Sequence, residues 1–416
     1  MQILIEQSSY ALDNMGDLAM LEVSVKRLKE LWPGATLRVF TSAPERVAAC
    51  FPQAQAFPIG GRATWFRPVL ASKQLPKPVQ GALAQWEWEL KSRASPLVHP
   101  VLHQKLSLRN RPTQPLDEFI TAVQNADLVL ATGGGYIADA FADFASSVLG
   151  VMALGIQLKK PTAMLGQGLG PLTLPHLIAK ARQVFPYLDL ITLREQRAGL
   201  PLLAQFGRLP SSNLIVTGDD AIELVYPNRQ ETLGTGIGVN LRVAAYSGVN
   251  EQILNTVRQA LQEVAQTLDA PLFPVPISRG HDSDPDSISQ LLNGADGGLA
   301  LDTPAKVIQQ VGQCRVMMTG SYHGGVFALA QGVPLVALVK SAYYKDKFLG
   351  LAQQFQQGCE VLYMDDPDLK TKLVHTLIRL WQASPDHRPH LLQRAREQME
   401  ASQQAYQYLH DLVESR

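Results

Sequence analysis

The sequence predicts an α/β protein made of two doubly wound, Rossmann-like domains that face each other across a cleft. Short apolar runs alternate with helical stretches, and a Gly- or Asp-bearing turn follows most of the runs, as in parallel βαβ units. The chain has 416 residues, which is too long for one ordinary hydrophobic core. A polar segment with Pro and Gly at residues 227–235 interrupts the alternation, which then starts again.

The first half gives six strands, each followed by a turn or a helix. The predicted strands cover residues 3–6, 37–41, 127–131, 161–165, 188–193 and 214–217, with helices at 18–31 and 44–50 and a third directly after Gly133–Gly135. We assign residues 1–228 to an N-terminal domain. In parallel sheets, ligands bind at the carboxyl ends of the strands, so the turns that follow them are the candidate site.

The second half repeats the pattern and gives a C-terminal domain at residues 234–388. Its predicted strands are 236–241, 272–276, 315–318 and 334–339, and its helices are 252–268, 286–292, 304–311, 323–331 and 344–355. A last helix at about 389–413, within a C-terminal segment 389–416, is long and of mixed polarity. We expect that segment to return and pack on the first domain.

The composition indicates a folded protein in a reducing compartment. The number of Lys and Arg residues equals the number of Asp and Glu residues, so the chain has no net positive charge that would favour binding to nucleic acid. Three distant cysteines without metal-ligand spacing indicate reduced thiols and no metal site. The N-terminus lacks a basic signal region, and the longest apolar stretch, 148–158, is too short to span a bilayer. We expect a cytoplasmic location; the oligomeric state stays open.

Residues 60–112 interrupt the alternation and are basic and aromatic. Only Glu87 and Glu89 oppose nine cations, and the segment also holds Trp65, Phe66, Trp86 and Trp88; the cations are Arg62, Arg67, Lys73, Lys77, Lys91, Arg93, Lys105, Arg109 and Arg111. Two interpretations stay open. The insertion is either a solvated loop with a helix, or a surface for an anionic acceptor or for peripheral contact with the inner membrane.

The segment 319–325 carries the most informative motif of the chain. An apolar strand at 315–318 precedes it and a helix follows, so His323 lies at a strand-to-helix turn. Unpaired N–H groups and the helix dipole attract anions to such a turn. A His there can carry a proton beside a bound anion, which indicates chemistry on a phosphorylated or carboxylated substrate.

Together with this motif, six others in the same order resemble the polysaccharide pyruvyl transferase family. They are Asn14, Gly16, Asp17 and Ala19; Gly133–Gly135; the stretch from Gly166 to Pro171; Leu193-Arg194-Glu195; Asp219 to Ala221; and Leu241-Arg242. The seventh comprises Ser321 to Gly324 with Phe327-Ala328 and Gly332-Val333-Pro334. Some members have Arg at the position of Ser321, where it is thought to help bind phosphoenolpyruvate. Here that charge must come from another residue.

The resemblance implies a fold similar to two-domain GT-B glycosyltransferases. It also implies transfer of pyruvyl from phosphoenolpyruvate to two hydroxyls of a sugar in a polysaccharide or its precursor, giving a pyruvate ketal and phosphate. Such ketals decorate exopolysaccharide, capsule or cell-wall glycans. Phosphoenolpyruvate is then a co-substrate, and no cofactor is expected. The acceptor is a glycan or a lipid-linked oligosaccharide.

The candidate site divides between the domains. His323 is the expected acid/base, and Arg242 can hold a carboxylate or phosphate with two parallel bonds. The donor-side candidates are Arg242, Ser321, Tyr322, Gly324, Gly325, Lys340 and Lys345, with Lys347 a further source of the missing charge. The acceptor-side candidates are Asn14, Gly16, Asp17, Gly133, Gly134, Gly135, Gln167 and Arg194. Structural roles stay open for several: Ser321 as a helix cap, the glycines as packing positions and Asp219 in fixing the turn between domains.

Two other functions stay open. A nucleotide-sugar glycosyltransferase of GT-B type is the first, although its diphosphate usually needs an acidic or Arg/Lys pair that Ser321-Tyr322-His323 does not supply. The second is a catalytically idle glycan-binding relative, which the presence of His323 and Arg242 disfavours.

Overall fold

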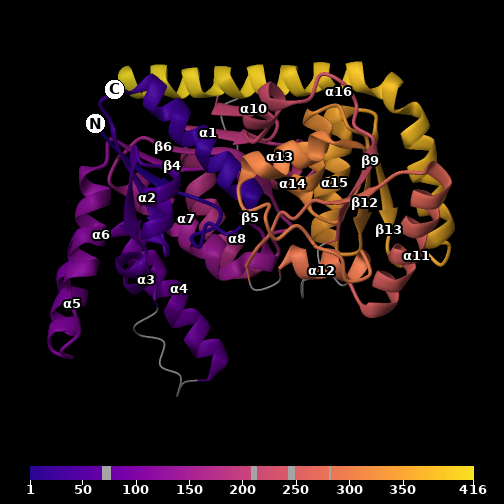
Figure 1. Ribbon diagram of the computed structural model, residues 1–416. Coiled ribbons are helices and arrows are strands. Elements are labelled where there is room, and N and C mark those ends of the chain that lie inside the picture. The colour runs from indigo at the N-terminus through magenta and orange to yellow at the C-terminus, as the bar shows by residue number, and fades with distance from the viewer. Residues whose placement is uncertain (68–75, 208–212, 242–248, 281–282) are drawn as a thin grey trace.

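The computed structural model describes residues 1–67, 76–207, 213–241, 249–280 and 283–416 (Figure 1). Within them the chain forms two all-parallel sheets, each covered by helices, as the alternation predicts. The N-terminal sheet has the order β3-β2-β1-β4-β6-β7-β8, with β5 paired to β6 beside this path, and the C-terminal sheet has the order β10-β9-β11-β12-β13.

The N-terminal domain holds eight strands and ten α-helices in its described part. The strands are β1 (Gln2–Glu6), β2 (Thr36–Thr41), β3 (Ala54–Pro58), β4 (Leu128–Ala131), β5 (Gly134–Ile137), β6 (Thr162–Leu169), β7 (Leu190–Leu193) and β8 (Leu214–Val216). The helices are α1 (Met15–Leu31), α2 (Pro44–Cys50), α3 (Gly60–Phe66), α4 (Lys77–Arg93), α5 (Ser95–Ser107), α6 (Gln114–Asn125), α7 (Ala142–Gln157), α8 (Pro175–Val184), α9 (Gly199–Ala204) and α10 (Ile222–Val225).

The C-terminal domain is smaller and ends in one long helix. Its strands are β9 (Gly236–Asn240), β10 (Leu272–Pro274), β11 (Cys314–Thr319), β12 (Leu335–Val339) and β13 (Cys359–Tyr363). Its helices are α11 (Glu251–Leu268), α12 (Asp284–Leu291), α13 (Pro304–Gly312), α14 (Tyr322–Ala330) and α15 (Ala342–Phe355), followed by α16 (Leu369–Glu414). Every residue of α14 is buried, which explains why its sequence is apolar on all sides.

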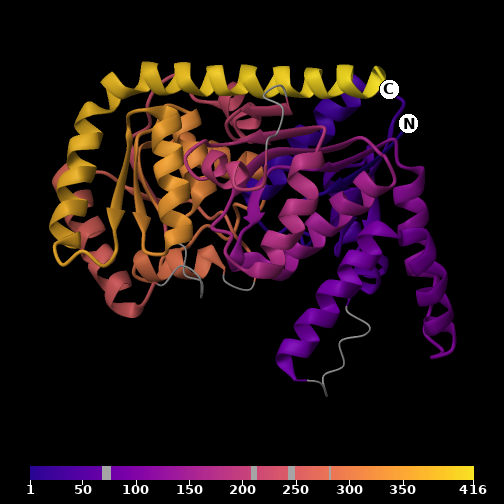
Figure 2. The ribbon, with the colours of Figure 1, turned by 180° about the vertical axis from the view of Figure 1, so that it is seen from behind.

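Three strands, β3, β5 and β13, were not predicted from the sequence, and the last helix begins earlier than predicted. Gly133–Gly135 does not lead directly into a helix, because Gly134 to Ile137 pair with β6 as an extra short strand. The last helix begins at Leu369 rather than near 389, and it continues through Pro385 and Pro389. It bends as it passes from the outer side of the C-terminal domain to the N-terminal domain (Figures 1 and 2), and proline is the usual cause of such a bend.

The α16 helix fastens the two domains together through polar contacts with α1. The Tyr406 hydroxyl lies 2.8 Å from the Ser24 hydroxyl, and Nη1 of Arg27 donates to Ser402 over 2.7 Å. Ser402 in turn donates to Asp220 over 2.6 Å. Arg27 is buried and also pairs with Glu223, so one guanidinium joins α1, the turn before α10 and α16.

The insertion 60–112 forms α3, α4 and α5 rather than a loop with one helix. Trp65 and Trp88 are buried, so only part of the aromatic content reaches the surface, where Trp86 is 54% exposed. Lys91 is also buried and pairs with Glu87.

One described helical segment, Asp139–Gln157, is long and apolar enough to cross a membrane by composition alone. Half of its most apolar window is buried inside the fold, where α7 packs against β4 and α8, as a core helix does.

We predict that Arg27→Ala strongly destabilises the protein. The change leaves the buried carboxylate of Asp220 and the partly buried carboxylate of Glu223 without their cation; breaking a buried pair typically costs about 3–5 kcal/mol. Urea unfolding followed by circular dichroism measures the shift. Lys26→Ala is the matched control: its exposed pair with Glu30 is worth about 0–1 kcal/mol. Equal urea midpoints of unfolding for the two variants would contradict a role for Arg27 in joining α1, the turn before α10 and α16.

Candidate functional site

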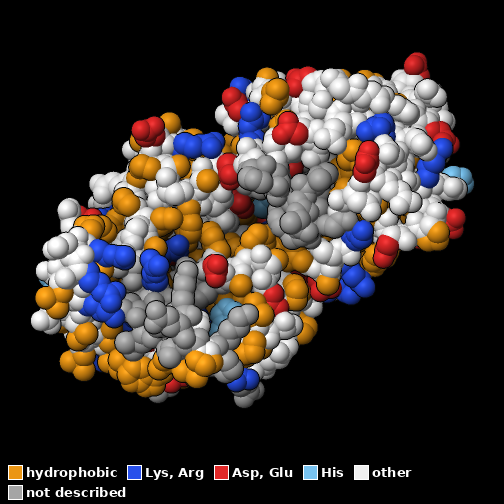
Figure 3. Space-filling view, turned by 90° about the horizontal axis from the view of Figure 1, so that it is seen from below, with side chains coloured by type: hydrophobic (Ala, Val, Ile, Leu, Met, Phe, Trp, Pro, Cys, Tyr) orange, Lys and Arg blue, Asp and Glu red, His pale blue; other side chains and the backbone are white. Residues whose placement is uncertain are grey.

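A cleft of about 300 Å³ opens between the carboxyl ends of the two sheets. The N-terminal domain contributes the start of α1, the β1–α1 loop, β5 and the end of β7, and the C-terminal domain contributes the starts of α14 and α15. Figure 3 shows the molecule hollowed between its two halves when it is seen from below. The N-termini of α1, α14 and α15 all meet this cleft, so three helix dipoles present their positive ends to it.

Backbone hydrogen bonds hold the two sides of the cleft together. The N–H of Met15 donates to Ile277 over 2.7 Å, and the N–H of Arg279 donates to Asp13 over 2.8 Å. On the other side, the Tyr343 hydroxyl donates to the carbonyl of Gly135 over 2.9 Å. The structure therefore represents a closed arrangement of the domains.

His323 lies in the first turn of α14 and crosses the interface to contact the N-terminal domain. Its Nε2 lies 3.6 Å from Oδ2 of Asp219, slightly beyond hydrogen-bond distance. Its ring packs against Gly16 so closely that a Cβ at that position would lie 1.9 Å from the ring Cγ. Glycine at position 16 is therefore what allows the ring to reach this place.

Asp219 is a buried carboxylate that faces both His323 and Arg194. Oδ2 faces His323 and also accepts from Nη1 of Arg194 over 3.2 Å, while Oδ1 accepts from the N–H of Ala221. Burial alone would raise the pKa of Asp219, but His323 and Arg194 lower it below its ordinary value. Asp219 thus stays ionised, accepts a hydrogen bond from Arg194 and turns the same oxygen toward His323. The sequence suggested only its role in the turn between domains.

Arg194 is buried but keeps unused hydrogen-bonding capacity. Its guanidinium lies 3.9 Å from the centre of the Tyr322 ring, and among the described residues its Nε and Nη2 have no hydrogen-bond partner. The Gly135 and Gly168 positions leave room for it, because a Cβ at either would lie within 2.6 Å of a guanidinium nitrogen. A buried guanidinium with free N–H groups at a cleft is suited to binding a carboxylate or phosphate.

Lys347 brings a second basic side chain close to Arg194, because a Cβ at Gly135 would lie 2.1 Å from the Lys347 ammonium and 2.6 Å from the Arg194 guanidinium. It projects from α15, and its ammonium approaches the hydroxyl of Tyr343 and the carbonyl of Gly135. Burial, and next the charge of Arg194, lower the pKa of Lys347 well below its usual range, although Asp17 and Asp219 oppose the shift. An anion bound between the two cations would offset their repulsion.

Asp17 supplies a second carboxyl group at the cleft. Burial raises its pKa, while His323, Ser8, Arg194 and Lys347 lower it in part, and the net shift is upward. Asn14 caps α1: its side-chain oxygen accepts from the N–H groups of Gly16 and Asp17. Asn14 therefore has a structural role, although it also borders the cleft.

The structure separates the candidate residues into two groups. Those that line the cleft are Asn14, Asp17, Gly135, Arg194, Ser321, Tyr322 and His323, and Gly16 packs directly behind His323. Ser321 occupies the N-cap position of α14, yet its side chain makes no capping hydrogen bond within the described chain.

The remaining candidates do not line the cleft. Gln167 is fully buried and donates to the carbonyls of Thr132 and Leu165, so it holds the β4–β5 turn rather than an acceptor. Gly133, Gly134, Gly324 and Gly325 are buried packing positions: an added Cβ would meet a neighbour at 3.0 Å or less in each. Lys340 is exposed away from the cleft, and Lys345 lies over the ring of Tyr363. Arg242 lies outside the described residues.

Several cleft residues were absent from the sequence-based prediction. They are Ser8, Ser9, Asp13, Tyr136, Phe141, Phe144, Ser278, Gly280, Tyr343 and Tyr344. Ser8 and Ser9 follow the first strand directly, so their position at a strand end was an available signal. Tyr343 and Tyr344 sit in the first turn of α15, where only the fold shows which face meets the cleft. Among the described residues no group of His, Cys, Asp and Glu is arranged to hold a metal ion.

Comparison with known proteins gives one family and one fold. A family model described as polysaccharide pyruvyl transferase matches residues 14–340. No curated protein matches the sequence. Among solved structures, the UDP-GlcNAc 2-epimerase of Neisseria meningitidis bound to UDP-GlcNAc is similar, with a TM-score of 0.55 and 11% identity over 98% of this chain and 99% of that chain.

Two further structures extend this likeness. A putative UDP-N-acetylglucosamine 2-epimerase from Listeria monocytogenes has a TM-score of 0.55 and 12% identity over 96% of this chain and 93% of that one. The glycotransferase of kitacinnamycin has a TM-score of 0.52 and 13% identity over 100% of this chain and 98% of that one. At such identities the likeness concerns the fold alone. It confirms the predicted arrangement of two facing Rossmann-like domains of GT-B type.

We predict that Gly16→Ala is poorly tolerated. The added methyl group would overlap the ring of His323, and overpacking of this kind typically costs about 1–3 kcal/mol. Thermal unfolding measures the effect. Gly34→Ala is the control, because nothing lies within 4 Å of a Cβ at position 34. If both variants unfold like the parent protein, the close contact between α1 and His323 does not exist in solution.

Proposed function

Because the chain belongs to the polysaccharide pyruvyl transferase family, we propose that it transfers pyruvyl from phosphoenolpyruvate to two hydroxyls of a sugar. The products are a pyruvate ketal on a polysaccharide or its precursor, and phosphate. The observation that carries this proposal is the cleft lined by His323, whose Nε2 faces Asp219, and by an Arg194 guanidinium with free donors. That arrangement offers a proton carrier next to a site for a small dianion.

The reaction requires balanced proton movements. A proton added to the methylene carbon makes C2 of the donor cationic, and the first sugar hydroxyl adds to C2 and loses its proton. The C–O bond to phosphate then breaks, phosphate keeps the electron pair, and C2 is cationic again. The second hydroxyl adds and loses its proton, so one released proton restores the acid and the other leaves with phosphate. His323 is the proposed acid; its ring packs against Gly16 and its Nε2 faces Asp219.

Asp17 is the second proposed proton carrier. Its pKa is raised by burial, and a carboxyl group with a raised pKa exchanges protons closer to neutral pH than an ordinary one. It lies on the N-terminal side of the cleft, where we place the sugar acceptor. It is therefore suited to accept a proton from an attacking hydroxyl.

Arg194 and Lys347 are proposed to hold the donor's charge. They supply two cations at the cleft, where this chain has Ser321 in place of the Arg of some relatives. This assigns Arg194 to the donor rather than to the acceptor. Arg242 remains a proposed further ligand of the carboxylate or phosphate.

The rival function is transfer from a nucleotide sugar. Its support is the fold: one similar structure contains UDP-GlcNAc and another is a glycotransferase. Among the described residues that line the cleft, however, the cations gather around one small space, which suits phosphoenolpyruvate better than a nucleotide.

We predict that the protein releases phosphate from phosphoenolpyruvate only when a suitable glycan is present. The His323→Ala variant should lower the rate of phosphate release by about 10²–10⁴-fold, which is the usual contribution of one general acid/base. A colorimetric phosphate assay with a panel of glycans and lipid-linked oligosaccharides measures it, and mass spectrometry identifies the ketal.

The control for this assay is His375→Ala, which removes an exposed His on α16 and leaves the rate unchanged. Thermal unfolding of both variants shows whether they remain folded. A fully active His323→Ala variant would mean that the proton carrier lies elsewhere. Turnover of a nucleotide sugar without phosphate release from phosphoenolpyruvate would favour the rival function.

We also predict that the affinity for the donor falls as the pH rises, and that the fall occurs at a lower pH than the usual lysine pKa of about 10.4. The pKa of Lys347 is lowered, so the free protein loses this positive charge earlier than usual as pH rises, and anion binding weakens with it. Calorimetric titration of phosphoenolpyruvate from about pH 7 to about pH 9.5 measures the trend. In Lys347→Met the affinity is low at every pH, and the trend is absent. A trend that survives in Lys347→Met would assign it to another group.

A further inference from the structure

The α4 and α5 helices carry most of the exposed large hydrophobic side chains of the described chain. Six of ten such residues belong to these helices or their ends. On α4, Val79, Trp86 and Leu90 are 44%, 54% and 41% exposed, and their spacings of seven and four residues place them on one helix face. The helices project from the body of the N-terminal domain (Figures 1 and 2).

The second helix continues this apolar surface. On α5, Leu97 and Val101 are four residues apart and 74% and 63% exposed, and Leu108 at its end is 80% exposed. A groove of about 180 Å³ between the helices is lined mainly by Leu90, Leu97, Val101 and neighbouring apolar residues. Exposed apolar side chains concentrated in this way mark an interaction surface rather than ordinary scatter.

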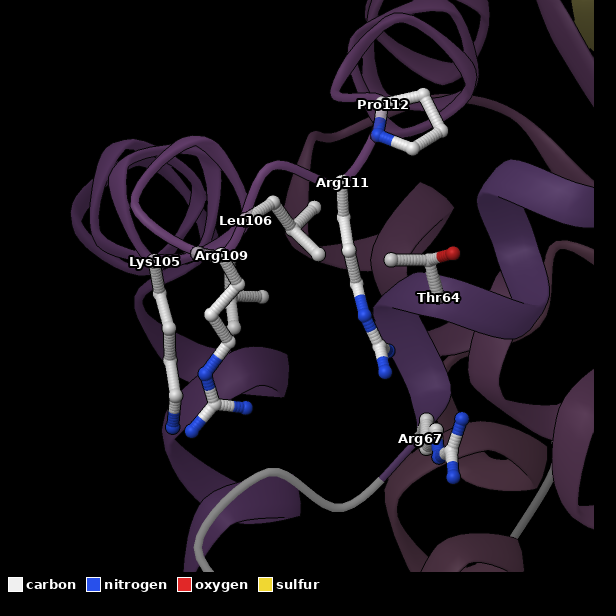
Figure 4. A pocket seen from close by; sticks show the side chains of 8 residues that line it. Thr64, Arg67, Lys105, Leu106, Arg109, Arg111 and Pro112 are labelled. Atoms are coloured by element: carbon white, nitrogen blue, oxygen red, sulfur yellow. The ribbon is translucent and has the colours of Figure 1, made fainter.

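A cluster of cations borders the same surface. Arg67, Lys105, Arg109 and Arg111 line a pocket of about 350 Å³ between α3 and α5, and among the described lining residues none is acidic. Figure 4 shows their charged ends gathered on one side of this pocket. None of the four has an ion-pair partner within the described part of the chain, although the net charge of the whole chain is zero.

We propose that this surface, the six exposed hydrophobic side chains of α4 and α5 together with the four cations, docks on an anionic lipid bilayer. Aliphatic and Trp side chains then enter the interfacial region, and the four cations bind lipid headgroups. The charges favour this occupant over a second copy of the chain. A two-fold contact centred here would bring the two cation clusters together, with no carboxylate lining the pocket to offset them.

The position of the surface suits work on a membrane-bound substrate. Figure 3, seen from below, presents both the orange and blue side chains of the N-terminal half and the hollow between the domains. A bilayer against α4 and α5 would therefore lie on the side to which the cleft opens. The docking itself does not depend on the proposed function, and its test uses no catalytic readout.

The test is co-sedimentation of the full chain with vesicles of phosphatidylcholine containing about 30% phosphatidylglycerol, compared with pure phosphatidylcholine. We expect binding to the anionic vesicles only, weakened by salt. Arg109→Ala with Arg111→Ala lowers the partition coefficient by roughly 10–50-fold, since each cation near an anionic surface contributes about a factor of five. Leu97→Ser with Val101→Ser lowers it by at least roughly fivefold.

Matched controls lie on the C-terminal domain. Lys306→Ala with Lys370→Ala removes two exposed cations, and Leu299→Ser removes a leucine that is 64% exposed; both leave binding within about twofold of the parent protein. Trp86 reports directly: its emission shifts to the blue on anionic vesicles, and Trp86→Phe loses that shift.

Three outcomes would overturn the proposal. The first is equal binding to neutral vesicles, or none to anionic ones. The second is equal loss of binding in the control and surface variants. The third is sedimentation of the chain as a dimer that Leu97→Ser with Val101→Ser converts to a monomer, which would assign the surface to a second copy.

Discussion

The shared carboxylate of Asp219 is the interaction on which the candidate site depends. One oxygen faces His323 from the C-terminal domain and Arg194 from its own domain, and the other caps the turn that begins at Ala221. Replacing this carboxylate would leave the buried guanidinium of Arg194 without its counter-charge and would remove the group that faces Nε2 of His323. Removing one partner of a buried ion pair costs more free energy than the intact pair contributes to stability. The site is therefore kept only when both domains are closed around the carboxylate.

Glycine determines how closely the charged groups approach one another. Gly16 makes room for His323, and Gly135 makes room for Lys347 and one end of Arg194. A Cβ atom added at either glycine would lie within 2.6 Å of these side chains. Glycine-rich motifs in such loops suggest backbone contacts with a phosphate. Here they create space for side chains that then contact the ligand, so the cations rather than the glycine N–H groups are the main anion-binding elements of the proposed site.

The sequence predicted the two-domain α/β fold and the placement of His323 because both rest on local signals: apolar periodicity and a strand-to-helix turn. It missed β3, β5 and β13; in the case of β5, Gly134 to Ile137 become a strand only by pairing with β6. It placed the start of α16 at about 389, which is too late, because the helix begins at Leu369 and continues through Pro385 and Pro389. It also selected Lys340 and Lys345 for the donor in preference to Lys347, because a choice among three neighbouring lysines depends on the helix face that meets the cleft.

The residue at position 321 bears on where the positive charge of the proposed donor site comes from. Where some relatives have an Arg beside the His, this chain presents a small hydroxyl at the start of α14, and its cations come instead from β7 and α15. Arg194 belongs to the N-terminal domain and Lys347 to the C-terminal domain, so neither domain alone carries the full charge of the proposed donor site. Anion binding then favours closure, because only the closed arrangement brings both cations to the ligand. By the same linkage, opening of the domains weakens the hold on phosphate, the proposed product, and allows it to leave.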